Sequence, residues 1–261
     1  MKTVFYSLVL TAFVVLPVRA DLTIVYSTMV QPASHAEKPQ ATPTAVAAAA
    51  TNMTIKVKGD KARIDASPQI TAIFDGRTGE LINLLNDQKT IVRISPDKMR
   101  AIGDMLNQFS SNKAKSDKPK LTPTGQKETI NGYDTEQNTY EGPDFKATYW
   151  IAPNYPNGAA VLAQLQSIKS EFWDAANTKM PDFRDFPGLP IRMRMIVGKV
   201  NPAGGHGGSA PDHPTEITST ITGVSFDSIA DSVFTVPANF KETKLPDIFN
   251  KNTPPTVSPN P

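Results

Sequence analysis

Two histidines and an aspartate lie close together in one stretch that could bind a metal ion. His206 stands between pairs of glycines, and Asp212 and His213 follow within the same Gly/Pro-rich segment. Imidazole and carboxylate are ligands of zinc and copper. A metal site also needs a fixed geometry and a supporting shell, which a glycine-rich loop does not supply. We therefore expect a surface loop and no metal site, and the third histidine, His35, lies in a segment of low complexity.

Paired carboxylates are the other residues whose spacing could support chemistry. Asp182 and Asp185 form one pair, and Asp227 and Asp231 form another. Such pairs can act as acid and base in hydrolysis, but both lie in polar connections, where carboxylates are commonly solvated or cap turns. The sequence has no Gly-x-Ser-x-Gly elbow and no phosphate-binding glycine loop. We expect no enzyme activity, no catalytic residue and no cofactor.

The complete absence of cysteine narrows the chemistry further. It excludes disulfides, thiolate catalysis, cysteine-bound metals and a lipid-modified N-terminal cysteine. A chain without disulfides has to be stabilised by its core. With 261 residues, the chain is long enough for one large domain with a sizeable core.

The N-terminus has the pattern of a secretory signal peptide. Lys2 precedes a short apolar run that is broken by Pro17, and Arg19 and Ala20 end it. We expect cleavage after Ala20, a periplasmic or secreted protein, and no stable membrane insertion afterwards. Cleavage would leave 25 basic and 25 acidic residues. A neutral chain gives no electrostatic reason to expect nucleic acid as a partner.

Short strands and tight turns dominate the chain. Residues 121–153 contain Asn131-Gly132, a strong hairpin signal, and a final strand in which Phe145, Ala147 and Tyr149 alternate with polar residues. Residues 52–94 show the same pattern, with turn sequences at 59–60 and 75–79. Neighbouring strands of this kind predict an antiparallel meander.

Two segments show helical periodicity instead. Ser95-Pro96-Asp97 is a helix start, because a capping hydroxyl precedes a proline and an acid. We expect helices at residues 96–111 and 159–177, with apolar stripes of Met99, Ile102, Met105, Leu106 and Phe109 in the first and Val161, Leu165, Ile168 and Phe172 in the second.

These elements predict an α+β fold. We expect a strongly curved antiparallel sheet, a half-barrel of about ten strands, with the two main helices packed on its concave side. The expected organisation is a signal peptide at residues 1–20, one domain at residues 21–249 and a disordered tail at residues 250–261. Within the domain we expect a mobile loop at residues 30–50 and a Gly/Pro-rich loop at residues 201–214.

Several short motifs, in this order, resemble a bacterial secreted family of unknown function. They are residues 58–65 (KGDKARID), 73–75 (IFD), 124–133 (TGQKETINGY), 150–152 (WIA), 187–190 (PGLP) and 234–240 (FTVPANF). That family is similar to the periplasmic lipoprotein carriers of the LolA, LolB and LppX type. The resemblance implies a half-barrel closed by helices, an envelope location and a hydrophobic ligand, and it implies no catalytic residue.

Two functions follow from the apolar stripes. In one, the helices and sheet enclose a cavity for a lipid, an acyl chain or a lipoprotein, since methionine and aromatic side chains adapt to varied apolar ligands. The candidate lining residues are Met105, Phe109, Trp150, Leu165, Ile168, Phe172, Trp173, Met193 and Met195. In the other, the same stripes form a filled core, and the protein is a structural or interaction module of the cell envelope with no ligand.

Overall fold

Most of the described chain is β-strand. The computed structural model describes residues 21–32, 50–101, 104, 120–141, 145–168, 181, 183–197 and 215–243. The expected signal peptide, the expected tail and most of the two expected loops lie outside the described residues. The strands are β1 (Leu22–Pro32), β2 (Thr51–Lys58), β3 (Lys61–Ser67), β4 (Ile70–Asp75), β5 (Glu80–Leu85), β6 (Thr90–Ile94), β7 (Thr122–Ile130), β8 (Tyr133–Glu141), β9 (Phe145–Ala152), β10 (Leu189–Val197), β11 (Thr215–Ser225) and β12 (Lys241–Thr243).

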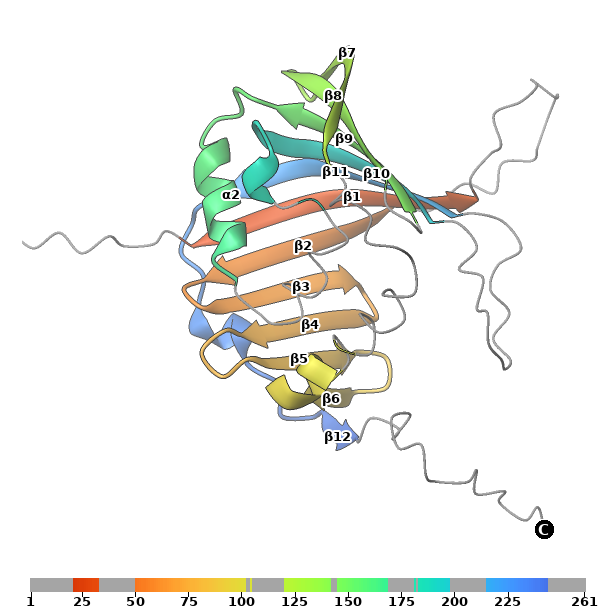
Figure 1. The fold of residues 1–261 in the computed structure, drawn as a ribbon. Coiled ribbons are helices and arrows are strands. Elements are labelled where there is room, and N and C mark those ends of the chain that lie inside the picture. The colour runs from red at the N-terminus through yellow and green to blue at the C-terminus, as the bar shows by residue number, and fades with distance from the viewer. Residues whose placement is uncertain are drawn as a thin grey trace, which may run out of the picture.

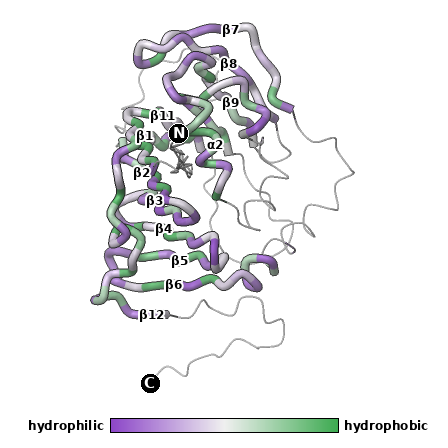
Figure 2. The backbone as a smooth tube through the Cα atoms, turned by 90° about the vertical axis from the view of Figure 1, so that its left-hand side faces the viewer, coloured by the Kyte–Doolittle hydropathy of each residue, from purple (hydrophilic) through white to green (hydrophobic). Residues whose placement is uncertain are grey.

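All twelve strands belong to one open sheet. Its order is β12-β6-β5-β4-β3-β2-β1-β11-β10-β9-β8-β7, so β12 and β7 are the two edges (Figure 1). Every pairing is antiparallel except that of β12 with β6, which is parallel. Seen from the side, the β7–β9 end bends toward the side of the sheet on which α2 (Gly158–Gln166) lies (Figure 2).

The expectation of an α+β half-barrel with about ten strands is therefore wrong. The fold is mostly β, and its sheet is open and mixed. Within the described residues, α-helix is confined to α2 and to residues 96–101 and 104. Two short 3-10 turns, η1 (Phe183–Asp185) and η2 (Asp231–Phe234), lie in the connections around β10 and β12. Adjacent meanders were predicted correctly, but the pairing that joins them was not.

Turn chemistry fixes the register of the meanders. Between β4 and β5, the Asp75 carboxylate accepts hydrogen bonds from the backbone N–H of Arg77 (2.9 Å) and Thr78 (3.3 Å). Between β7 and β8, Asn131 and Gly132 have φ angles of 51° and 82°. Two residues at positive φ suit the twist of a two-residue hairpin, and Asn-Gly is the pair that adopts it most readily.

Helix α2 begins one residue before the expected start at residue 159 and ends at Gln166, before the expected end at residue 177. Asn157, at φ 57°, precedes it, and its last turn ends at Ser167, whose hydroxyl donates a hydrogen bond to Gln164 O (2.7 Å). Residues 169–180 lie outside the described residues. The start of the helix is fixed against β10, because a Cβ at Gly158 would lie 3.3 Å from Leu189 Cβ.

The β7–β8 hairpin tip contacts a strand that is not its neighbour. The pairing of β10 with β11 begins only at Arg192 and Thr220, so the earlier residues of β10 are unpaired with β11. The tip reaches β11 at this point, where Asn131 Nδ2 donates a hydrogen bond to Ile221 O (2.8 Å). Ile130 beside it is 2% exposed. This contact fixes the end of the sheet that bends.

Three clusters of buried side chains form the core. The largest joins α2 to the centre of the sheet and contains Leu22, Ile24, Val57, Ile130, Trp150, Ala152, Val161, Leu162, Leu189, Ile191 and Ile221. A second lies on β4–β6 and contains Ile73, Leu84, Ile91, Ile229 and Phe234. A third lies on β8–β10 beside η1 and contains Tyr140, Ala147, Tyr149, Ile151 and Phe186.

Candidate ligand-binding face

One face of strands β1–β6 is apolar from strand to strand. In antiparallel sheets, paired residues share a face. The register therefore places Leu22, Val57, Ala62, Phe74, Leu81 and Ile94 in one transverse row. A second row contains Ile24, Ile55, Ile64, Ala72, Asn83 and Val92. A third contains Tyr26 and Met53 on β1 and β2, and Ile70 and Leu85 on β4 and β5. We call this surface the apolar face.

Burial across the apolar face is uneven. Leu22 and Val57, which pack with α2, are 0% exposed. Farther from α2, Ile64, Leu85 and Val92 are only half-buried, and Ile70 is 46% exposed. These four side chains belong to none of the three core clusters of the described residues. Ala62 and Phe74 of the first row stay buried, at 2% and 5% exposed. The apolar face is therefore partly open on β3–β6 along its second and third rows.

The opposite face of β4–β6 is closed. The segment that follows β11, residues 226–240, packs Ile229 and Phe234, each 7% exposed, onto Ile73, Leu84 and Ile91. We call this face the closed face. Both faces of β4–β6 are therefore apolar, and residues 226–240 join one of them in a buried cluster. On the other, the helical residues 96–101 lie over β5 and β6 (Figure 1), with Met99 3% exposed.

Polar contacts attach that covering segment to the sheet. Lys58 Nζ donates a hydrogen bond to Ile229 O (2.6 Å) and forms an ion pair with Asp231 (2.9 Å). Arg63 donates a hydrogen bond to Val233 O (2.9 Å), and the backbone N–H of Ile229 donates to the Asp21 carboxylate (2.7 Å). The hydrogen bond and the charge of Lys58 lower the pKa of Asp231.

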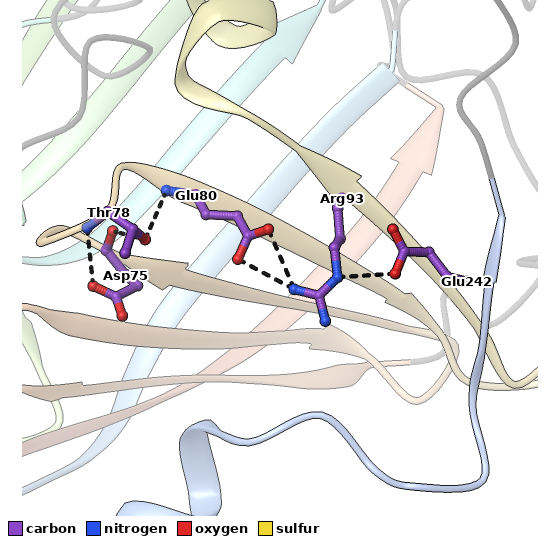
Figure 3. Close-up of polar contacts among 5 residues, drawn as sticks. All are labelled: Asp75, Thr78, Glu80, Arg93 and Glu242. Carbon is purple, nitrogen blue, oxygen red and sulfur yellow. Dashed lines mark hydrogen bonds and ion pairs between the residues drawn. The ribbon is translucent and has the colours of Figure 1, made fainter.

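The last strand is attached to the sheet by an arginine between two glutamates. Arg93 of β6 lies 3.2 Å from Glu80 of β5 and 3.2 Å from Glu242 of β12 (Figure 3). Its pKa is raised: burial lowers it, but the hydrogen bonds and charges of the two glutamates outweigh that effect. The same picture shows the Asp75–Thr78 turn that precedes Glu80. The three charged groups connect β5, β6 and β12 at this edge of the sheet.

The tyrosine at the α2 end of the apolar face has a shifted pKa. Burial raises the pKa of Tyr26 to about 12 from 10.0, because the charged phenolate is poorly solvated there. Tyr149 in the third cluster also has a raised pKa, first because of burial and second because of the neighbouring Tyr140. Tyr26 packs on the α2 cluster but remains half-buried, so water is only partly excluded from the apolar face where it meets α2.

The nine candidate lining residues do not lie together in one described site. Leu165 and Ile168 pack on the α2 cluster, which also contains Trp150. Met193 packs on the third cluster, beside Tyr149 and Phe186, and Met195 is half-buried on the same strand. The structure thus places these five in more than one environment. The other four candidates, Met105, Phe109, Phe172 and Trp173, lie outside the described residues.

The candidate acids and metal ligands are placed as follows. Asp231 pairs with Lys58, and Asp227 accepts a hydrogen bond from the Ser225 hydroxyl, so both have structural contacts. Asp185 is exposed in η1. His35, His206, Asp212, His213 and Asp182 lie outside the described residues. Within the part of the chain that the structure describes, no group of three or more His, Asp or Glu side chains is placed to hold a metal ion.

Sequence reasoning missed two groups of residues. The strands β3–β6 were predicted, but their half-buried residues were not singled out. Which face of these strands is covered depends on residues 226–240, which are far away in sequence. Arg192 and Arg194 were missed as well. Their guanidinium carbons lie 5.7 Å and 5.8 Å from the centroid of the Trp150 ring. Their alternate positions in a strand, on the side opposite Met193 and Met195, were the only available signal.

Comparison with known proteins gives a weak likeness in structure. No family model and no curated protein matches the chain. Two solved structures of PNGF-II, in different crystal forms, match with TM-scores of 0.36 and 0.35 and sequence identities of 12% and 10%. The matches cover 87% and 88% of this chain but only 32% of the PNGF-II chains. A likeness at this level carries no inference about fold family or activity.

No helix in the described ranges has the length and apolar character needed to cross a membrane.

Proposed function

We propose that this protein binds a hydrophobic molecule, such as an acyl chain or lipid, on the apolar face of β1–β6, and that it does so in the cell envelope. The observation that carries the proposal is the difference between the two faces of β4–β6. The closed face is covered by residues 226–240, whereas on the apolar face Leu85 and Val92 remain half-buried and Ile70 remains exposed. The envelope location rests on the signal-peptide pattern of residues 1–20.

The chemistry of the apolar face suits a flexible aliphatic ligand. Its half-buried side chains are aliphatic, apart from Tyr26, the methionine Met53 and the amide Asn83. They offer dispersion contacts over several strands but few directional hydrogen bonds. Each 100 Å² of apolar surface removed from water contributes about 2.5 kcal/mol before the costs of association. A long acyl chain lying along one transverse row would bury several times that area.

The alternative from the sequence is a structural or interaction module with a filled core. The edge strand β7 is the feature that could serve such a module, because it is exposed along its length except at Ile130. That edge is poorly suited to strand addition, since Pro123 lacks an N–H and the pairing shifts register between Pro123 and Lys127. The apolar face therefore supports the ligand-binding function better.

The test is uptake of a fluorescent fatty-acid analogue by protein purified from the periplasm without detergent. We expect saturable uptake, and a lipid adduct in native mass spectra. Ile64→Asp and Val92→Asp should each weaken uptake at least about tenfold, because a carboxylate placed among apolar groups costs more than about 1.4 kcal/mol. Circular dichroism would confirm that both variants remain folded.

Met29→Asp is the matched control. Met29 is 41% exposed and lies on the other face of β1, because its neighbour Val30 shares the side of Tyr26. This variant should bind the analogue as the parent does. Equal loss in Met29→Asp, or no uptake and no adduct in the parent, would contradict the proposal and favour the interaction module. N-terminal sequencing of the same preparation tests cleavage after Ala20.

A further inference from the structure

Two arginines of β10 lie against one tryptophan of β9. Arg192 and Arg194 have their guanidinium carbons 5.7 Å and 5.8 Å from the ring centroid of Trp150. Trp150 is 9% exposed, and both arginines are half-buried. Cation–π contact holds a guanidinium in place and leaves its N–H edge available for further hydrogen bonds. The ring therefore orients two positive charges on one patch of the sheet.

Of these two arginines, only Arg192 forms an ion pair with a carboxylate of the described residues. Arg192 forms an ion pair with Glu128 of β7 (3.0 Å), and its Nε donates a hydrogen bond to the Thr220 hydroxyl (3.2 Å). For Arg194, no carboxylate of the described residues lies within ion-pair distance. Among the described residues, the cluster thus carries one positive charge more than the carboxylates paired with it neutralise. Half-buried like charges repel each other, so a bound anion would stabilise this arrangement.

The residues that pair with Arg194 on the two neighbouring strands both carry hydroxyl groups. It pairs with Thr148 on β9 and with Thr218 on β11. Thr148 is 4% exposed and Thr218 is half-buried. Ser27 of β1 shares this face, because it pairs with Thr220, which pairs with Arg192. Trp150 also belongs to the α2 cluster, together with Leu22, Ile24 and Val57 of the apolar face, so the patch borders the core at the α2 end of that face.

We propose that Arg194, with Arg192 and the neighbouring threonines, binds a singly charged oxyanion, of the phosphodiester or carboxylate class. A guanidinium fork matches two oxygens of such a group. The single unpaired charge of the cluster suits a monoanion better than a dianion. The site does not depend on the hydrophobic ligand proposed above, because it uses charged and hydroxyl groups of β9–β11 and not the half-buried side chains of β3–β6.

The test uses Trp150 as its own reporter. The chain contains two tryptophans, so Trp173→Phe leaves Trp150 as the sole emitter. The probes are glycerophosphoglycerol, short-chain dihexanoyl phosphatidylglycerol with the same headgroup, and acetate, each titrated against a matched concentration of sodium chloride. Saturable change with both phosphodiesters alike indicates a headgroup site. Tighter binding of the lipid form indicates that the acyl chains also make contact, and a response to acetate alone indicates a carboxylate site.

Four further substitutions separate the site from a general salt effect. Arg194→Gln should weaken binding at least about tenfold, because it removes a charge-assisted pair of hydrogen bonds. Arg194→Lys, which keeps the charge without the fork, should fall between it and the parent. Arg77→Gln, in the exposed β4–β5 turn, should change nothing. Glu128→Gln should tighten binding, since it removes the only acid paired with the cluster in the described chain.

Three results would overturn the proposal. One is equal affinity in Arg194→Gln and the parent. A second is weaker binding in Glu128→Gln, which would mean that the salt bridge to β7 matters only for folding. The third is a parent response no larger than that to chloride, up to about 10 mM of every probe. Thermal melting of each variant shows whether the sheet is intact, and the Glu128 variant keeps the test valid if Arg194→Gln unfolds.

Discussion

The two faces of β4–β6 have similar composition and different surroundings. Leu84 and Leu85 are neighbours in β5, and they point to opposite sides. Leu84 is 1% exposed, beneath residues 226–240, and Leu85 is half-buried on the apolar face. An apolar residue in a strand therefore does not by itself mark the core. What distinguishes the faces is a covering segment that joins the sheet through Lys58, Arg63 and Asp21.

The largest difference between the two faces is expected when the same side chain is shortened on each. Leu84→Ala should lower the free energy of unfolding by about 2–5 kcal/mol, because it leaves a cavity in a closed cluster. Leu85→Ala should cost about 1 kcal/mol, because part of that side chain is already in contact with water. Urea denaturation of both variants measures the difference. Equal losses would mean that the apolar face is as closed as its opposite.

Alkaline pH sharpens the comparison at the α2 end of the apolar face. The folded pKa of Tyr26 is raised to about 12 from 10.0. Because the folded pKa of Tyr26 is raised, the neutral phenol stabilises the fold fully below the unfolded pKa near 10. This contribution is lost as the pH rises through the folded pKa of about 12. The contribution of Tyr26 is at most about 3 kcal/mol.

Unfolding free energies of the parent and Tyr26→Phe, measured from about pH 8 to about pH 11, test this. The parent should lose stability more steeply than the variant above about pH 10. Parallel curves would show that water reaches Tyr26, and that the apolar face is open even beside α2.

The smallest effect concerns the attachment of β12. Glu242→Gln removes one of the two carboxylates that pair with Arg93. The distance from Arg93 Nε to Glu242 Oε2 is 3.2 Å. The Glu242 side chain is 60% exposed, so the pair is worth about 0–1 kcal/mol and less in high salt. Thermal melting at low and high salt measures it. A loss above about 2 kcal/mol would show that this pair, rather than Ile229 and Phe234, holds the covering segment in place.

Local turn chemistry made most strands predictable from the sequence. Asn131-Gly132 and the segment from Asp75 to Gly79 specify hairpins through their own backbone preferences. The Ser95-Pro96 helix start and the helix after Asn157 were also found, since their signals lie within a few residues. The helical pattern after Ser167 did not predict where α2 ends, because periodicity marks a stripe and not its terminus.

Long-range pairing could not be predicted in this way. Strand β1 pairs with β11, and β12 has only three residues, too few to show an alternation. Residues 226–240 contain Ile229 and Phe234 without a regular spacing, so nothing in the sequence marks them as the cover of β4–β6. The half-barrel was inferred from neighbouring strands and two apolar stripes. The sheet order shows how incomplete such local information is.

The pairing of β1 with β11 also has a consequence for how the chain folds. Thr28 and Ser219, whose hydroxyls lie 3.0 Å apart, are separated by 191 residues along the chain. The central pairing of the sheet cannot form until nearly the whole polypeptide has been synthesised, and contacts so distant in sequence make folding slow. Until then β1 pairs only with β2, and its other edge is open to pairing with another chain.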